Sequence, residues 1–222
     1  MNGELLRFDW IVRNLDTIYE RSVQHVQLTV IAVVVGFAIS FPLGILSYRK
    51  RRLYAPISWV TGLLYTIPGI ALFAFLVPYT GLTNLTAEIG LVSYTLLILI
   101  RNIFVGLDGV PEEVKEAAQG LGFTPRQTLW RVELPLALPA IVAGLRIATV
   151  TTIGLVTITA LFGKGGLGFF ILLGLERFFP TAAIVGAVLS MILAIVFDGA
   201  LLGAQRVLMP WARRVPATIA TS

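Results

Sequence analysis

The chain has 222 residues, of which 57% are hydrophobic and only 13% are charged, whereas charged residues make up about 25% of a soluble domain. This composition excludes an ordinary soluble protein and indicates an integral membrane protein. The chain has no cysteine and one histidine, His25, which excludes disulfide and thiolate chemistry and leaves no metal site, because His25 cannot form one by itself. The net charge of +5 comes from basic residues spread over several loops, which points to membrane orientation and not to a nucleic-acid partner.

Apolar segments long enough to cross a lipid bilayer recur along the chain. A helix rises about 1.5 Å per residue, so about 20 apolar residues cross the ~30 Å hydrocarbon layer, whereas the strands of a membrane barrel are shorter and alternate in polarity. We therefore expect an all-α fold, a polytopic helical bundle with about five transmembrane helices. The predicted spans are residues 23–48, 57–79, 86–107, 136–162 and 181–205.

The distribution of basic residues predicts the orientation of the bundle. With five spans, ten basic residues fall on one side of the membrane: Arg49, Lys50, Arg51, Arg52, Lys115, Arg126, Arg131, Arg206, Arg213 and Arg214. Five fall on the other side: Arg7, Arg13, Arg21, Lys164 and Arg177. Because cytoplasmic loops are enriched in Lys and Arg, we expect the amino terminus outside and the carboxyl terminus in the cytoplasm.

This orientation defines the expected domain organisation. Residues 1–22 form an external segment, residues 23–208 a transmembrane domain with a cytoplasmic loop at 108–135, and residues 209–222 a cytoplasmic tail. The first twenty residues lack the basic-then-apolar order of a cleaved signal peptide, so the first span is expected to act as the targeting signal.

Proline and glycine mark the expected irregularities of the spans. We expect Pro42, Pro68 and Pro139 to interrupt their helices, because proline lacks the N–H that continues a helix. The glycine-rich residues 163–168 lack the spacing of a phosphate-binding loop and are interpreted as a flexible external turn. The apolar residues 169–179 that follow are too few to cross the bilayer and predict a re-entrant or interfacial helix.

The loop at 108–135 is the one sizeable polar stretch between long apolar runs. Pro111 and two acidic residues predict the start of a helix that ends at Gly120 or Gly122. Thr124 then caps a second helix with Pro125 at its first position. This helix is expected to run to about residue 133, where Leu134 and Pro135 turn the chain into the next span.

A pair of short helices in a 28-residue loop is more than a simple connection requires. One interpretation places the pair on the lipid headgroups, which Arg126, Trp130 and Arg131 would suit. The other makes it a docking element for a soluble partner, because small alanines and a glycine corner permit close approach of another backbone.

The spacing of seven residues in this loop resembles the EAA loop of the permease subunits of ATP-binding-cassette importers. The matching residues are Glu116, Ala117, Ala118, Gly122, Val132, Leu134 and Pro135. Residues 67–72, 100–102, 133–139 and 165–168 further resemble the branch that imports osmoprotectants such as glycine betaine, carnitine and choline. The resemblance covers about residues 20–208. The methionine-importer branch shares the five-span core and stays an alternative.

The resemblance implies a type I importer permease fold in a bacterial cytoplasmic (inner) membrane. The first helix of the loop would be a coupling helix that docks on a cytoplasmic ATPase dimer. A second permease copy, identical or different, would complete the passage, and an extracellular or periplasmic binding protein would deliver the substrate. Transport would proceed by alternating access. The chain has no Walker-type phosphate loop, so we expect no catalytic residue and no cofactor in it, with ATP and Mg²⁺ used by the partner ATPase.

Three threonines of the fourth span are candidates for the translocation path. At about 100° per residue, Thr149, Thr152 and Thr159 share one face of a helix. They form a polar stripe that can line a passage. The alternative is that their hydroxyl groups bond the carbonyl groups of their own helix or pack between helices.

Two charged residues fall inside predicted spans, where an unpaired charge is costly. Arg146 and Asp198 both lie within about 10–17 Å of the expected cytoplasmic edge, given the rise of a helix. We therefore expect them to form a charge pair within or between subunits. The alternative is that Arg146 extends to the headgroups while Asp198 meets cytoplasmic water.

Two other classes of protein remain alternatives. A transporter or channel that needs no ATPase would place a site of ionisable residues near the middle of the membrane, and apart from Arg146 and Asp198 we expect none there. A membrane scaffold would share the docking loop but has no need of spans interrupted by proline and glycine.

Overall fold

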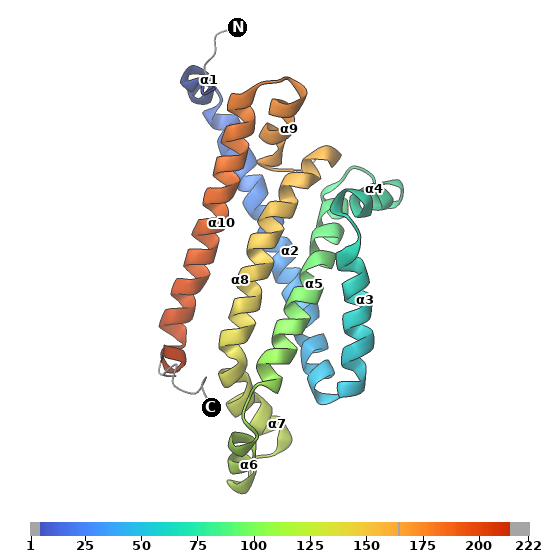
Figure 1. Ribbon diagram of the computed structural model, residues 1–222, viewed down its shortest axis with the longest axis vertical. Helices are drawn as coiled ribbons and strands as arrows, with labels where there is room; N and C mark the ends of the chain where they lie inside the picture. Colours follow the sequence, from blue (N-terminus) through green and yellow to red (C-terminus); the bar gives the residue numbers. More distant parts are fainter. Residues whose placement is uncertain (1–4, 164, 214–222) are drawn as a thin grey trace, which may run out of the picture.

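The computed structural model describes residues 5–163 and 165–213, and this part of the chain folds into helices without any β-strand (Figure 1). The helices are α1 (Phe8–Arg13), α2 (Leu15–Arg49), η1 (Arg51–Leu53), α3 (Tyr54–Thr66), α4 (Gly69–Thr80), α5 (Asn84–Asp108), α6 (Glu112–Gly120), α7 (Pro125–Thr128), η2 (Leu129–Glu133), α8 (Leu134–Ile158), η3 (Thr159–Phe162), α9 (Gly168–Glu176), α10 (Pro180–Leu208) and η4 (Pro210–Arg213). Of the residues named above, Lys164 and Arg214 lie outside the described residues, as does the tail from residue 214 onward.

Four of the helices are long and apolar enough to cross a membrane on their own: α2, α5, the continuous helical stretch Pro125–Phe162, and α10. They correspond to four of the five predicted spans. The prediction of an all-α membrane bundle is therefore confirmed. The fifth span exists only if α3 and α4 are counted together, since they are bent by 93° with respect to each other.

The break between α3 and α4 falls at Pro68, where the sequence predicts an interruption of the span over 57–79. Pro68 starts the second helix and cannot donate to the turn before it. The freed carbonyl group of Ile67 accepts a hydrogen bond from the Tyr94 hydroxyl of α5, which is how a break persists away from water. At about 1.5 Å per residue, the 13 residues of α3 rise only about 20 Å.

The other two prolines do not break their helices. Pro42 lies inside α2 and Pro139 inside α8, and both helices continue past them. The expectation that they interrupt the spans is wrong. One proline removes one backbone hydrogen bond, and packing on both sides holds the rest of the helix in place.

Close approach between α2, α5 and α8 forms the centre of the bundle, and small residues make it possible. Gly36 and Gly44 of α2 lie directly against Thr95 and Ile103 of α5, so closely that an added Cβ atom would overlap those side chains. Gly144 of α8 lies in the same way against Asn102 of α5. Without a hydrophobic force between helices in lipid, such backbone contact supplies the packing energy.

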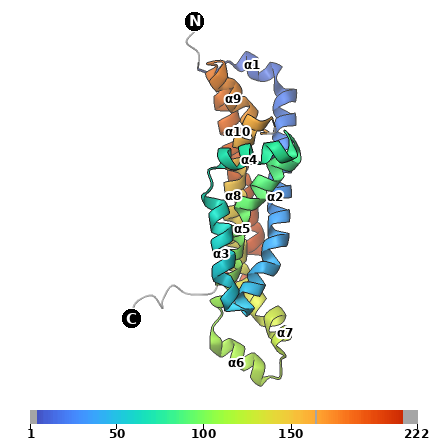
Figure 2. The same cartoon turned by 90° about the vertical axis from the view of Figure 1, so that its right-hand side faces the viewer.

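The two ends of the bundle carry different elements. The N-terminal end carries α1, with α9 and α4 towards the same end, whereas α6 and α7 project beyond the spans at the other end, towards which α10 runs to its last residue (Figures 1 and 2). Most of the loop at 108–135 thus stands clear of the spans, as its polarity predicts.

Candidate functional site

The projecting loop starts with α6, whose limits follow from local chemistry. Glu112 and Glu113 lie in its first turn, where carboxylates suit the helix dipole. The helix ends at Gly120, and Gly122 follows with a φ of +82°. The Gly122 N–H donates to the Gln119 carbonyl at 2.8 Å. Nothing lies within 4 Å of an added Cβ at Gly122, so the left-handed backbone, and not crowding, requires glycine there.

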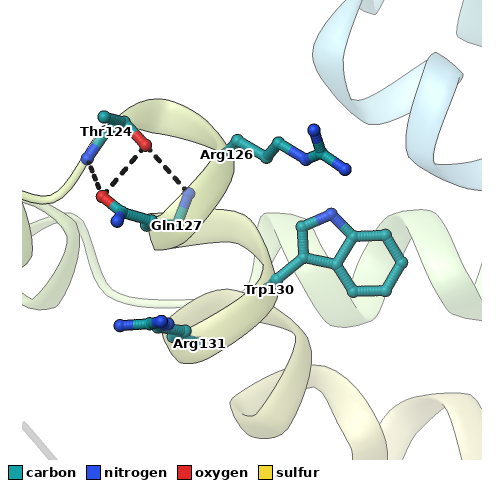
Figure 3. A pocket seen from close by; sticks show the side chains of 5 residues that line it. All are labelled: Thr124, Arg126, Gln127, Trp130 and Arg131. Carbon is teal, nitrogen blue, oxygen red and sulfur yellow. Dashed lines mark hydrogen bonds between the residues drawn. The ribbon is translucent and has the colours of Figure 1, made fainter.

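The second helix of the loop begins with the predicted cap. Thr124 and Gln127 form a reciprocal capping box, in which the Gln127 side chain accepts from the Thr124 N–H at 2.8 Å (Figure 3). Pro125 occupies the first helical turn, where its missing N–H costs nothing. These contacts arise within four residues, which is why the sequence pattern predicts them.

The expected turn at Leu134 and Pro135 is wrong. The helix continues from α7 through η2, a π-helical segment, into α8. The Leu134 N–H donates to the Leu129 carbonyl five residues earlier, and this wider turn accommodates a proline that has no N–H to donate. The second helix of the loop and the fourth span therefore form one continuous helix, Pro125–Phe162.

One side of α6 is fixed to the bundle. The Lys115 ammonium group lies 3.1 Å from a Glu112 carboxylate oxygen and 5.7 Å from the ring centroid of Tyr48 in α2. Burial acts to lower the pKa of Lys115, but hydrogen bonds to Glu112 and Tyr48 outweigh it and hold the pKa above its ordinary value. Ala118 on the same side is buried. The ammonium group stays charged and anchors the helix.

The seven residues of the EAA pattern divide into two groups. Glu116, Ala117 and Gly122 are exposed on the loop. By contrast, Leu134 is buried in the cluster that contains Ile103 and Leu107 of α5. The remaining members are Ala118, which is buried, and Val132 and Pro135, which are half-buried. The pattern thus combines exposed residues on and just after α6 with a buried residue, Leu134, at the start of α8.

The three threonines of the predicted path lie inside the single chain. Thr149, Thr152 and Thr159 are all buried. The Thr149 hydroxyl donates to the Leu145 carbonyl at 2.7 Å, and the Thr159 hydroxyl donates to the Val156 carbonyl at the same distance. Hydrogen bonding within their own helix, the alternative above, is thus present, and a role in the path stays a prediction.

The structure brings Arg146 and Asp198 together. The Arg146 Nε and Nη2 atoms donate to the two carboxylate oxygens of Asp198, each at 2.8 Å. This two-point contact joins α8 to α10 beside a cleft of about 460 Å³ that Ile147, Val150 and Thr151 also border. A guanidinium fork on a carboxylate is a strong and directional contact, so it ties the continuous helix Pro125–Phe162 to the last span.

His25 is the residue that sequence reasoning missed. It is completely buried in α2. Its Nε2 lies 3.0 Å from the Ile153 carbonyl of α8, and its Nδ1 accepts from the Leu167 N–H at 3.3 Å. The neutral tautomer with the proton on Nε2 satisfies both contacts. A lone histidine in an apolar run does not indicate that its ring will join α2 to α8 and to the segment before α9.

Most of the glycine-rich segment is packed around this junction, so the expectation that the turn is flexible is wrong. Its external position stays a prediction. Gly165 to Gly168 are buried. A Cβ on Gly166 would come within 2.7 Å of His25, and a Cβ on Gly168 within 2.2 Å of the Thr157 carbonyl oxygen. The glycines allow this segment to approach α2 and α8 closely, as small residues do between membrane helices.

The following helix, α9, is short, as predicted for residues 169–179. Gly174 of α9 lies against Ala183 of α10, with an added Cβ only 2.5 Å from the Ala183 nitrogen. Phe170 is buried in the same cluster as Val185. The helix is therefore packed on α10.

The loop offers surfaces for docking and no assembled chemical centre. In the part of the chain that the structure describes, no three His, Asp or Glu side chains come together where they could hold a metal ion. The features of the loop are a free face on α6, an anchored start of α8 and exposed arginines beside α7.

Comparison with known proteins places these features in context. Residues 29–210 match the family model described as "Binding-protein-dependent transport system inner membrane component". The osmoprotectant import permease protein OsmW of Salmonella typhimurium is 40% identical over 192 residues, which cover 84% of this chain and 89% of OsmW. The choline transport system permease protein OpuBB of Bacillus subtilis is 37% identical over 190 residues, 86% of this chain and 88% of OpuBB.

The architecture has counterparts among solved structures. A structure titled as an inward-facing conformation of the MetNI methionine ABC transporter matches with a TM-score of 0.75 and 27% identity, over 83% of this chain and 92% of that chain. A second, titled as an amino acid ABC transporter with histidines, matches with a TM-score of 0.70 and 17% identity, over 90% of this chain and 98% of that chain. At 17% identity, this second match shows similarity of the fold alone.

Proposed function

Since this chain belongs to the family of inner membrane components of binding-protein-dependent transport systems, we propose that it forms the translocation pathway for a quaternary ammonium osmoprotectant, such as glycine betaine, carnitine or choline. The observation that carries this proposal is the similarity, along nearly the whole chain, to permeases named for these solutes. The methionine alternative has the support of a structural match at lower identity.

In this proposal α6 is the coupling helix that docks on a cytoplasmic ATPase dimer. Its exposed face carries Glu116 and Ala117, and the small alanine permits close contact with a partner groove. The anchored face, with Lys115 and Ala118, would pass the force to the bundle. The chain itself would bind no cofactor and carry out no catalysis, and ATP and Mg²⁺ would belong to the ATPase.

The proposed orientation places the amino terminus outside a bacterial inner membrane and the carboxyl terminus in the cytoplasm. Its support is the separation of charges between the two ends of the bundle. The end with α6 and α7 carries the basic residues 49–52 together with Lys115, Arg126 and Arg131, whereas the end with α1 and α9 carries fewer, such as Arg7 and Arg177. Cytoplasmic loops are the richer in Lys and Arg.

The mechanism that we propose is alternating access between two permease copies, identical or different, with an extracellular or periplasmic binding protein that delivers the solute. The continuous helix Pro125–Phe162 would carry a displacement of the loop into the membrane as one rod. The contact of Arg146 with Asp198 would pass it on to α10. Separation of α8 from its neighbours would then turn the stripe of Thr149, Thr152 and Thr159 towards the path.

The test of the proposed solute is reconstitution of the chain with its ATPase and binding protein in vesicles. ATPase activity and uptake are measured with glycine betaine, choline, carnitine or methionine. We expect stimulation by at least one quaternary ammonium compound and none by methionine. Stimulation by methionine alone would overturn the proposed substrate class and leave the permease fold untouched.

The test of the docking loop is a pair of variants at Gly122. A β-branched side chain in the left-handed region costs about 1–2 kcal/mol, whereas asparagine is tolerated there. We expect Gly122→Val to reduce copurification of the ATPase and Gly122→Asn to keep it. Normal copurification of Gly122→Val, inserted in the membrane at wild-type levels, would contradict docking through this corner.

A further inference from the structure

The cleft beside the pair of Arg146 and Asp198 has the size of a small-molecule site. Its volume is about 460 Å³, within the range of about 300–1,000 Å³ that is usual for such sites. It lies between α8 and α10, which pack against each other (Figure 1). The side chains of Arg146 and Asp198 are 27% and 36% exposed, so a solute in the cleft can reach both charges.

The charged pair leaves hydrogen-bonding groups free at the cleft. The contact with Asp198 uses Nε and Nη2 of Arg146, whereas a guanidinium group has five N–H donors. In the part of the chain that the structure describes, Nη1 of Arg146 has no hydrogen-bond partner. Nor has the Thr151 hydroxyl, although Thr149 and Thr157 donate to carbonyl groups of the same helix. A ligand with acceptor oxygens can therefore bind here without displacing Asp198.

The charges of the cleft favour a ligand that carries one charge of each sign. Among the described residues, no charged side chain other than Arg146 and Asp198 borders it. Charges inside a span are costly unless they are paired, so a cation alone would add an unbalanced positive charge, whereas a zwitterion keeps the cleft neutral. Ile147 and Val150, which border the cleft and are exposed, offer apolar contacts for methyl groups.

We propose that this cleft binds a short zwitterion with a quaternary ammonium group and a carboxylate, such as glycine betaine. The carboxylate would accept from the free N–H groups of Arg146 and from the Thr151 hydroxyl, and the trimethylammonium group would lie against Asp198 and Val150. One methylene group separates the two charged groups of glycine betaine, which suits charged side chains in contact at 2.8 Å. Carnitine has three carbon atoms in this place, and choline has no carboxylate. The inference rests on the proposed function and narrows its solute class.

The experiment is equilibrium dialysis of radiolabelled glycine betaine against the full chain in lipid nanodiscs. The binding protein is left out, because its own affinity would hide that of the chain. We expect saturable binding, with choline at least tenfold weaker than glycine betaine as a competitor, because choline lacks the charge-assisted contact with Arg146. Equal displacement by choline and glycine betaine would show a site for a cation alone and overturn the proposal.

Two variants test the cleft without breaking the charged pair. Thr151→Val removes the hydroxyl at nearly constant shape and should weaken glycine betaine binding about threefold to tenfold. Val150→Trp fills the cleft and should abolish saturable binding. The matched control is Thr157→Val, the same change on the same helix, where the hydroxyl donates to the Gly154 carbonyl at 2.6 Å and does not border the cleft. We expect this control to bind within twofold of the wild-type chain.

The outcome for these variants decides whether the cleft is the site. Unchanged binding in both Thr151→Val and Val150→Trp would overturn it, as would equal losses in Thr151→Val and Thr157→Val. The midpoint of thermal unfolding of each variant verifies that the bundle is intact.

Arg146→Lys tests the recognition of the carboxylate. Lysine keeps a positive charge beside Asp198 but replaces the planar fork by a single ammonium group. We expect glycine betaine binding to weaken at least tenfold, and the weaker binding of choline to stay within twofold, because choline has no carboxylate. Equal losses for the two solutes would mean that the variant changes the packing of the cleft, and would overturn the proposed contact.

The site and the proposed function can fail separately. Uptake of glycine betaine by the reconstituted transporter, without saturable binding to the chain in nanodiscs, would overturn the cleft as a site and leave the proposed function in place. Stimulation of the reconstituted transporter by methionine alone would overturn both.

Discussion

Replacement of His25 by leucine tests the junction between α2, α8 and the segment before α9. The imidazole ring fills a completely buried position and supplies a donor to the Ile153 carbonyl and an acceptor to the Leu167 N–H. Leucine has a similar volume and neither function. The variant therefore leaves two backbone groups without these partners while it changes the packing little.

The expected loss of stability follows from the two contacts. A buried polar group that loses its partner costs about 1–3 kcal/mol, so two such groups give about 2–6 kcal/mol. The contact of Nδ1 with Leu167 is 3.3 Å long, against 3.0 Å for the contact of Nε2 with Ile153. The longer bond is the weaker one, which places the expectation for His25→Leu in the lower half of this range.

The assay is reversible unfolding of the full chain in mixed detergent micelles, followed by circular dichroism and tryptophan fluorescence. Thr29→Val is the matched control, because Thr29 is buried one turn along α2 and its hydroxyl bonds only the His25 carbonyl of its own helix at 2.9 Å. We expect this control to lose less than about 1 kcal/mol, within the usual range for one hydrogen bond. A free energy of unfolding for His25→Leu within about 0.5 kcal/mol of wild type, the size of a typical surface substitution, would refute the reasoning.

Three further changes probe contacts between spans, each by the midpoint of thermal unfolding in detergent. Arg146→Gln should lower the midpoint because it leaves the Asp198 carboxylate without its guanidinium partner. The double variant Arg146→Asp with Asp198→Arg should restore part of the loss. Equal midpoints for the single and the double variant would contradict a stabilising contact between the two residues. Gly44→Val should lower the free energy of unfolding by about 1–3 kcal/mol through overpacking, because its Cβ would lie 2.6 Å from Ile103. The control Gly62→Ala should leave stability unchanged, since nothing lies within 4 Å of the added Cβ. Equal midpoints for these two variants would be evidence against tight packing at Gly44. Tyr94→Phe should cost about 1–3 kcal/mol because the Ile67 carbonyl loses its partner, and an unchanged midpoint would mean that this carbonyl does not need it.

Local chemistry made the loop predictable. The glycine corner at Gly122 and the cap at Thr124 depend on groups within four residues of each other, so their residue types are sufficient evidence. Likewise, an apolar run of about 20 residues predicts a span whatever lies beside it. The pair of Arg146 and Asp198 is an intermediate case, because helix rise places both at one depth but not on facing sides.

Apart from the turn expected at Leu134 and Pro135, where the cause is local, the errors concern contacts between distant residues. Pro68 breaks its span, whereas Pro42 and Pro139 do not break their helices. Because the residue type is the same in each case, it cannot by itself predict a break. What distinguishes Pro68 is the Tyr94 hydroxyl of another helix, which donates a hydrogen bond to the freed carbonyl of Ile67. Similarly, the sequence of residues 163–168 indicates a flexible turn, because no residue near them along the chain indicates the contact with His25.

By itself the sequence determined the class of protein, the long spans, the helical loop and the side of the membrane that its charges favour, because these depend on composition and on neighbouring residues. Only the tertiary structure decided where a span bends, which glycines are in contact with another backbone, and how His25 joins three segments. These features depend on groups separated in the chain, by 27 residues for Ile67 and Tyr94 and by 128 for His25 and Ile153, and their meeting depends on the packing of the whole bundle.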